Sequence, residues 1–106
     1  MFKLDQNPTF WNKVEWQLPG EKKENFKAKF KVAPLDQLEG DEFVAGEGNA
    51  RLLKSIILDV EDVLDAAEKP AKFSAGLIDQ LLNVPYIRNA LLAAYINGVS
   101  GAHRGN

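Results

Sequence analysis

Few side chains in this sequence could carry out acid–base or nucleophilic chemistry. The single histidine, His103, stands in a glycine-containing stretch close to the last residue. A general base needs a fixed geometry, and chain ends are usually disordered unless tied down, so His103 is expected to be an exposed tail residue. Ser55, Ser74 and Ser100 lie in no nucleophile turn of the G-x-S-x-G kind, and no second histidine could activate them. We therefore predict that the protein is not an enzyme.

Metal and cofactor sites have equally little support. Asp59, Glu61, Asp62 and Asp65 form an acidic cluster, but they lack the alternating oxygen ligands, central glycine and closing glutamate of a calcium loop. A solvated helix end is the favoured interpretation. Glycine-rich phosphate loops are absent, and zero cysteines exclude disulfides and sulfur-bound metals. We expect no cofactor and no metal.

Lysines are concentrated in one segment with aromatic neighbours, which is the composition of a single-strand nucleic-acid site. Strand alternation would place Phe26 and Phe30 on the face opposite most of these lysines, so a solvated strand face that resists edge-to-edge association is predicted. A net charge of -2 and a pI near 5.4 also argue against nucleic-acid or membrane partners. The lysines are Lys22, Lys23, Lys27, Lys29 and Lys31.

The elements that would position these side chains begin with two segments of alternating apolar and polar residues. From Phe10 to Leu18 the even positions are mostly apolar, and from Phe26 to Val32 the alternation is cleaner. Pro19-Gly20 opens a polar turn between them. The pattern predicts an antiparallel hairpin of residues 10–18 and 25–32, and its apolar face needs helices to cover it.

Helical periodicity follows the hairpin. Asn49 is expected to cap a helix that ends between Glu61 and Leu64, with its apolar stripe at Leu52, Leu53, Ile56, Ile57 and Val60. Ser74 is expected to cap a short helix over 75–82. Asn83-Val84-Pro85 then ends this helix, and Pro85 suits the first turn of a last helix that runs almost to the end of the sequence.

These elements predict one α+β domain over 1–106, in which the hairpin packs on three or four helices. Its parts are a β-hairpin part (1–33), an acidic glycine-containing link (34–48), a helical part (49–100) and a frayed tail (101–106). No apolar run approaches the ~18 residues that span a bilayer, so a cytoplasmic protein is expected. The predicted core is Val14, Trp16, Phe26, Phe30, Leu53, Ile56, Ile57, Val60, Leu77, Leu81 and Leu91.

The last helix carries more apolar surface than one small core can cover. One face holds Ile87, Ala90, Leu91 and Ala94, and a second holds Leu92, Tyr95, Ile96 and Val99. Anchors at this spacing dock into the grooves of partner proteins, so we predict that the second face binds other copies or a partner helix. The alternative is that helix 75–82 folds over this face within the monomer.

Three segments together resemble the small tail assembly chaperones of long-tailed phages and prophages. The first is Phe2-Lys3-Leu4 and Asn7-Pro8-Thr9-Phe10 with the two strands after it. The second is Lys72-Phe73-Ser74 leading into Leu81-Leu82-Asn83-Val84-Pro85, and the third is the helix and basic tail from Ala90 to Asn106. The chain differs from that group at residues 59–62, where the group has a Gly-Trp type pair, and in its acidic segment 39–48.

The resemblance implies a non-enzymatic protein of the host bacterial cytoplasm. Such chaperones coat the helical tape-measure protein, recruit tail-tube subunits during assembly and then leave, and some exist in a longer frameshifted form. Two alternatives stay open: another prophage structural or adaptor protein, such as a minor tail component, and a small nucleic-acid-binding regulator. A chaperone of this kind needs reversible self-association, so a homo-oligomer is one of the expected partners.

Overall fold

The computed structural model describes residues 8–33 and 46–100, which form one α+β fold of three strands and three helices. The predicted hairpin and the predicted switch to helices are confirmed. The elements in chain order are β1 (Thr9–Trp16), β2 (Glu24–Lys31), α1 (Gly46–Ile56), β3 (Ile57–Glu61), α2 (Ala75–Leu82) and α3 (Pro85–Ser100).

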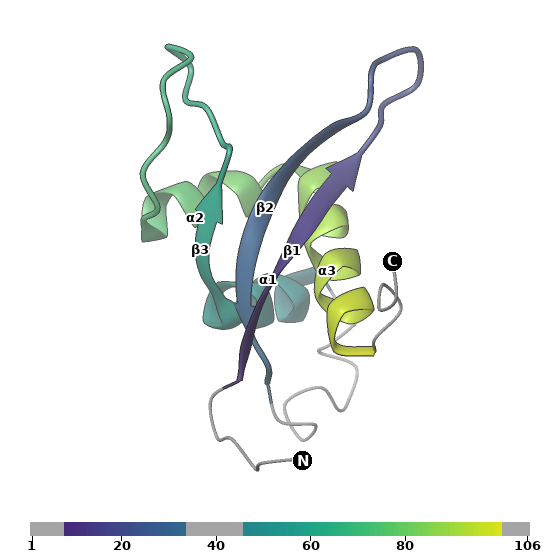
Figure 1. Ribbon diagram of the computed structural model, residues 1–106, viewed down its shortest axis with the longest axis vertical. Helices are drawn as coiled ribbons and strands as arrows, with labels where there is room; N and C mark the ends of the chain where they lie inside the picture. Colours follow the sequence, from purple (N-terminus) through teal and green to yellow (C-terminus); the bar gives the residue numbers. More distant parts are fainter. Residues whose placement is uncertain (1–7, 34–45, 101–106) are drawn as a thin grey trace.

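The strands form one antiparallel sheet in the order β1-β2-β3, and the helices lie against one of its faces (Figure 1). β1 and β2 pair from Thr9 opposite Lys31 to Trp16 opposite Glu24. Gly20 at φ 77° lies in the turn between them, where the N–H of Glu21 donates to the carbonyl of Leu18 at 3.0 Å. This φ favours glycine because it carries no Cβ. The turn and the loop after β3 project at the same end of the molecule (Figure 1).

The predicted helix from Asn49 to the region of Glu61 is wrong at its start and in its second half. α1 begins at Gly46, so Asn49 lies within the helix and is not its cap. α1 ends at Ile56, and the next residue, Ile57, begins β3. Ile57 and Val60 are three residues apart, which is a helical spacing, and both are buried. A bulge resolves this: Lys29 pairs with Asp59 while Phe30 pairs with Ile57, so Leu58 is an extra residue in the ladder. One extra residue returns both side chains to the inner face of a strand.

The core lies between the inner face of the sheet and the three helices. Of the predicted core residues, Trp16 and Leu77 are only partly buried and the others are buried. An aromatic group joins the layers: the ring centroids of Phe10, Phe30 and Tyr95 are 5.3 to 6.2 Å apart. The buried residues that were not among the predicted core residues are Ala28, Ala33, Leu52, Ile78, Leu82, Ala94 and Tyr95.

The predicted start signals of the last two helices are confirmed. The Ser74 hydroxyl accepts a 3.0 Å hydrogen bond from the N–H of Leu77 and so caps α2, and Pro85 is the first residue of α3. Within the described ranges, no helix combines the length and the apolar character needed to cross a membrane.

Candidate functional site

The structure divides the predicted contact face of α3. Tyr95 is 1% exposed, so the prediction that it lies on an open contact face is wrong. Its ring packs on Phe10 and Phe30, and its hydroxyl accepts a hydrogen bond from the N–H of Ala33 at 3.0 Å. The aromatic rings of the sheet therefore cover this residue.

The rest of that face is more open. Leu92 is half-buried and packs against the core, whereas Ile96 and Val99 are 39% and 40% exposed. These two side chains lie three residues apart on α3 and share one side of the helix. Of the predicted contact face, this small exposed apolar pair near the end of α3 remains.

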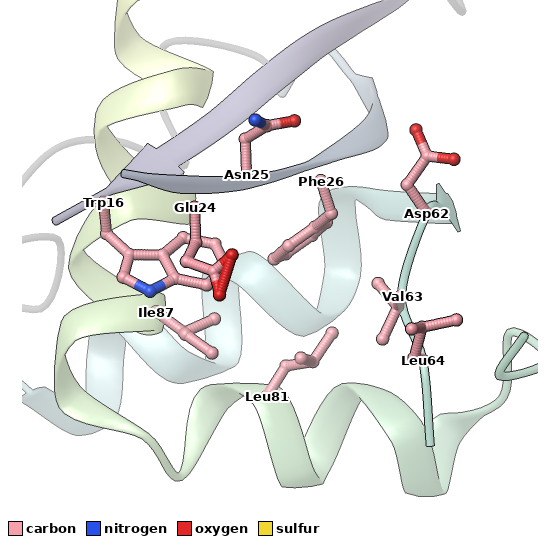
Figure 2. A pocket seen from close by; sticks show the side chains of 9 residues that line it. All are labelled: Trp16, Glu24, Asn25, Phe26, Asp62, Val63, Leu64, Leu81 and Ile87. Carbon is pink, nitrogen blue, oxygen red and sulfur yellow. The ribbon is translucent and has the colours of Figure 1, made fainter. Parts of the chain in front are cut away.

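A larger apolar surface, which no sequence pattern indicated, lies at the end of the sheet where the hairpin turn projects. Trp16, Phe26, Leu64, Leu81 and Ile87 line a pocket of about 340 Å³, which we call the apolar groove. Figure 2 shows that these side chains come from β1, β2, the segment after β3, α2 and α3. The groove exists only when all five segments are in place.

Local contacts hold the walls of the groove. Trp16 packs edge-on against Phe26, with ring centroids 5.7 Å apart, and lies 6.1 Å from the ring of Tyr86. On the opposite wall, a bridge between Leu64 and Pro70 and a hydrogen bond from Ala71 N–H to the Val63 carbonyl close the loop after β3. This loop presents Leu64, which is 59% exposed, at the rim. Apolar side chains gathered around a hollow, unlike single exposed ones, are typical of binding surfaces.

Two neighbouring hollows share walls with the apolar groove and lengthen it. One, of about 500 Å³, continues past Trp16 to Leu18 and Tyr86. The other, also about 500 Å³, continues past Leu64 and Leu81 to Leu77 and Val84. The hollowed surface thus extends on both sides of the pocket of about 340 Å³, called the central pocket below, as a site for an elongated segment would.

The charged side chains that line the central pocket, among the described residues, are both acidic. In Figure 2, Glu24 lies beside the indole of Trp16, and Asp62 lies on the other side of Phe26 with its carboxylate directed away from the floor. Asp62 has φ 69°, a left-handed conformation that aspartate and asparagine adopt more readily than most residues. Polar groups therefore stand at the rim and apolar groups on the floor.

The outer face of the sheet carries the predicted lysine stripe. Phe26 and Phe30 point into the core, as predicted, and Lys27 and Lys31 are exposed. Trp11, however, pairs with Lys29 and is itself exposed, so one aromatic ring does share the lysine face. On the neighbouring strand β3, Glu61 pairs with Lys27 and Asp59 pairs with Lys29. These carboxylates offset part of the positive charge.

The acidic cluster is not the predicted helix end. Asp59 and Glu61 belong to β3, and Asp65 shapes the following loop by accepting the N–H groups of Ala67 and Lys69 at 2.9 and 3.0 Å. Over the part of the chain that the structure describes, no group of three or more such residues could hold a metal ion. His103 and most of the acidic link 34–48 lie outside the described residues.

Comparisons with protein-family models, with curated proteins and with solved structures find no match to this chain. The apolar groove is therefore the feature on which a function is best argued. In the sequence, Val63 and Leu64 continue the helical spacing of Leu52 to Val60, so periodicity did not mark them as residues of the groove.

Proposed function

We propose that this protein is a phage tail assembly chaperone, which binds the tape-measure protein and recruits tail-tube subunits without catalysing a reaction. The observation that carries the proposal is the apolar groove with exposed Leu64 at its rim, extended on both sides by further hollows. The sequence resemblance to such chaperones supplies the identity of the partners.

The shape of this surface suits a helical segment. An amphipathic helix bound in a groove uses anchors at i, i+3, i+4 and i+7, which spread along one side of the helix. The central pocket would take one anchor and the two neighbouring hollows would take those before and after it. A long tape-measure helix repeats such anchors, so several copies of the chaperone could bind along its length.

The exposed pair Ile96 and Val99 supplies a second contact. It lies near the end of α3 in the sequence, whereas the residues of α3 at the apolar groove, Tyr86 and Ile87, lie at its start. A chaperone with two contact areas can hold the tape-measure protein with one and a tail-tube subunit or another copy with the other. We assign the apolar groove to the tape-measure protein because it is the larger of the two.

Co-expression with a tape-measure fragment encoded in the same locus tests this function. The wild-type chain should co-purify with the fragment, and Leu64→Asp should not, because it places a charge at the rim. Leu58→Asp is the matched control, since Leu58 is also an exposed leucine but lies in β3, away from the groove. Equal capture by all three proteins would contradict the assignment to the groove.

Purified phage particles give an independent test. An assembly chaperone leaves the tail before it is complete, so mass spectrometry of purified particles should not detect the protein. Its presence there in a fixed ratio to the tail-tube protein would instead support a minor tail component.

A further inference from the structure

We propose that the apolar groove selects a cationic amphipathic helix, in which lysine or arginine flanks the apolar anchor that enters the central pocket. This inference rests on the proposed function and specifies the chemistry of the bound segment. It is carried by the combination of an apolar floor with Glu24 and Asp62 at the rim (Figure 2).

The two carboxylates are available to a partner. The ion pairs found among the described residues join Lys23 with Glu15 and Lys54 with Asp79, and neither involves Glu24 or Asp62. Both side chains belong to exposed residues. An incoming cation would therefore meet carboxylates that the described part of the chain leaves without a basic partner.

The acidic character is strongest at the centre of the surface. The neighbouring hollow at Tyr86 is lined by Lys22 as well as Glu21 and Glu24, and the one at Leu77 is lined by Lys72 as well as Asp65. Of these three hollows, the central pocket alone has two carboxylates and no basic side chain among the described residues that line it. The bound helix should therefore carry its cations next to the central anchor rather than along its whole length.

The walls also favour long cationic side chains. The aliphatic part of a lysine or arginine can cover apolar surface while its charged end stays in water. A cation beside Glu24 would also be close to the Trp16 indole, whose ring face attracts positive charge. Both effects add to the attraction of the carboxylates.

Two synthetic helical peptides test the inference. They share one leucine stripe at i, i+3, i+4 and i+7, and the positions beside the central leucine are lysine in one peptide and glutamate in the other. Calorimetry at low and high salt measures their affinity for the full chain. The wild-type protein should prefer the lysine peptide by about threefold to tenfold, the range for two exposed ion pairs, and salt should reduce this preference.

The double variant Glu24→Gln with Asp62→Asn should lose the preference and keep the affinity for the leucine stripe. Asparagine is chosen at 62 because it also tolerates the left-handed φ of this residue. The control is Glu15→Gln with Glu61→Gln, which removes the same charge from exposed residues that do not line the central pocket. The control should keep the preference of the wild type.

The outcomes separate this inference from the proposed function. Equal binding of both peptides by the wild-type protein, or loss of the preference in the control variant as well, overturns the inference. If a tape-measure fragment is still captured in that case, the proposed function stands without it. If the lysine peptide is preferred as expected but no tape-measure fragment is captured, the inference about the groove stands and the proposed function fails.

Discussion

Gly98 of α3 lies directly against the ring of Phe10 in β1. A Cβ at residue 98 would come within 3.0 Å of three carbon atoms of that ring. The ring has little room to move because it packs on Phe30 and Tyr95, with ring centroids 5.3 and 6.2 Å away. The absence of a side chain at residue 98 thus sets how closely α3 approaches the sheet.

Gly98→Ala should therefore destabilise the protein. Overpacking of a core costs about 1–3 kcal/mol, which exceeds the gain of up to about 1 kcal/mol from replacing glycine by alanine in a helix. Gly76→Ala is the control, because the nearest atom to a Cβ there is the Ser74 hydroxyl at 3.8 Å. It should be neutral or stabilising in urea unfolding. Equal stabilisation by both changes would contradict the tight contact at Phe10.

Tyr95→Phe should reduce the free energy of unfolding by about 1–3 kcal/mol, because it leaves the buried N–H of Ala33 without its acceptor. The ring and its packing are kept, so the loss reports the hydroxyl. Urea unfolding measures the loss, and hydrogen exchange should show faster exchange of the Ala33 amide. Tyr86→Phe, at an exposed tyrosine, should change stability by less than about 0.5 kcal/mol.

Ile56→Ala should cost about 2–5 kcal/mol, because Ile56 is fully buried at the end of α1. Leu81→Ala belongs to the same class, since Leu81 is also buried. Leu77→Ala, at a partly buried position of α2, should cost less than either. A loss below about 0.5 kcal/mol at Ile56 in chemical denaturation would place this residue outside the core.

Ser74→Ala should cost about 1 kcal/mol by removing the cap of α2. The first turn of α2 should then exchange its amides faster than the rest of the helix. Ser100→Ala is a suitable control because Ser100 is the last residue of α3 and its hydroxyl donates to the Asn97 carbonyl of the same helix. If the midpoint of thermal unfolding falls equally in both variants, the hydrogen bond between Leu77 N–H and the Ser74 hydroxyl does not stabilise α2.

Ile96→Asp with Val99→Asp should leave the protein folded, since both residues are exposed, and should abolish self-association or tail-tube binding through the end of α3. Tyr95→Asp should instead unfold the protein, because it buries a charge without a partner. Sedimentation and circular dichroism distinguish these effects. A double variant that folds and still associates would place the second contact elsewhere.

The parts of the fold that were predictable depend on neighbours in sequence. Alternation and Pro19-Gly20 sufficed for the hairpin, and Ser74 and Pro85 for two helix starts. β3 was missed because a bulge gives Ile57 and Val60 the spacing of a helix. Tyr95 was misplaced because α3 is apolar on several sides, and only the position of β1 and β2 decides which side is buried.

The candidate site was less predictable than the fold. Trp16 and Leu81 are 65 positions apart in the numbering of the sequence, and no local pattern relates either of them to Leu64. They line one pocket only because five segments meet at one end of the sheet. By contrast, Ile96 and Val99 lie on adjacent turns of one helix, so their spacing in the sequence was enough to predict that they share a face.

The order of the elements in the chain decides which surfaces are still uncovered while the protein is being synthesised. β1 and β2 leave the exit tunnel first and can pair at once, but β3 follows only after α1, and α3 follows after α2. Until Tyr95 emerges, Phe10 and Phe30 of the nascent hairpin have no aromatic cover from α3. A ribosome stalled before α3 would therefore hold a nascent chain with an open aromatic face, to which general folding factors of the cell could bind.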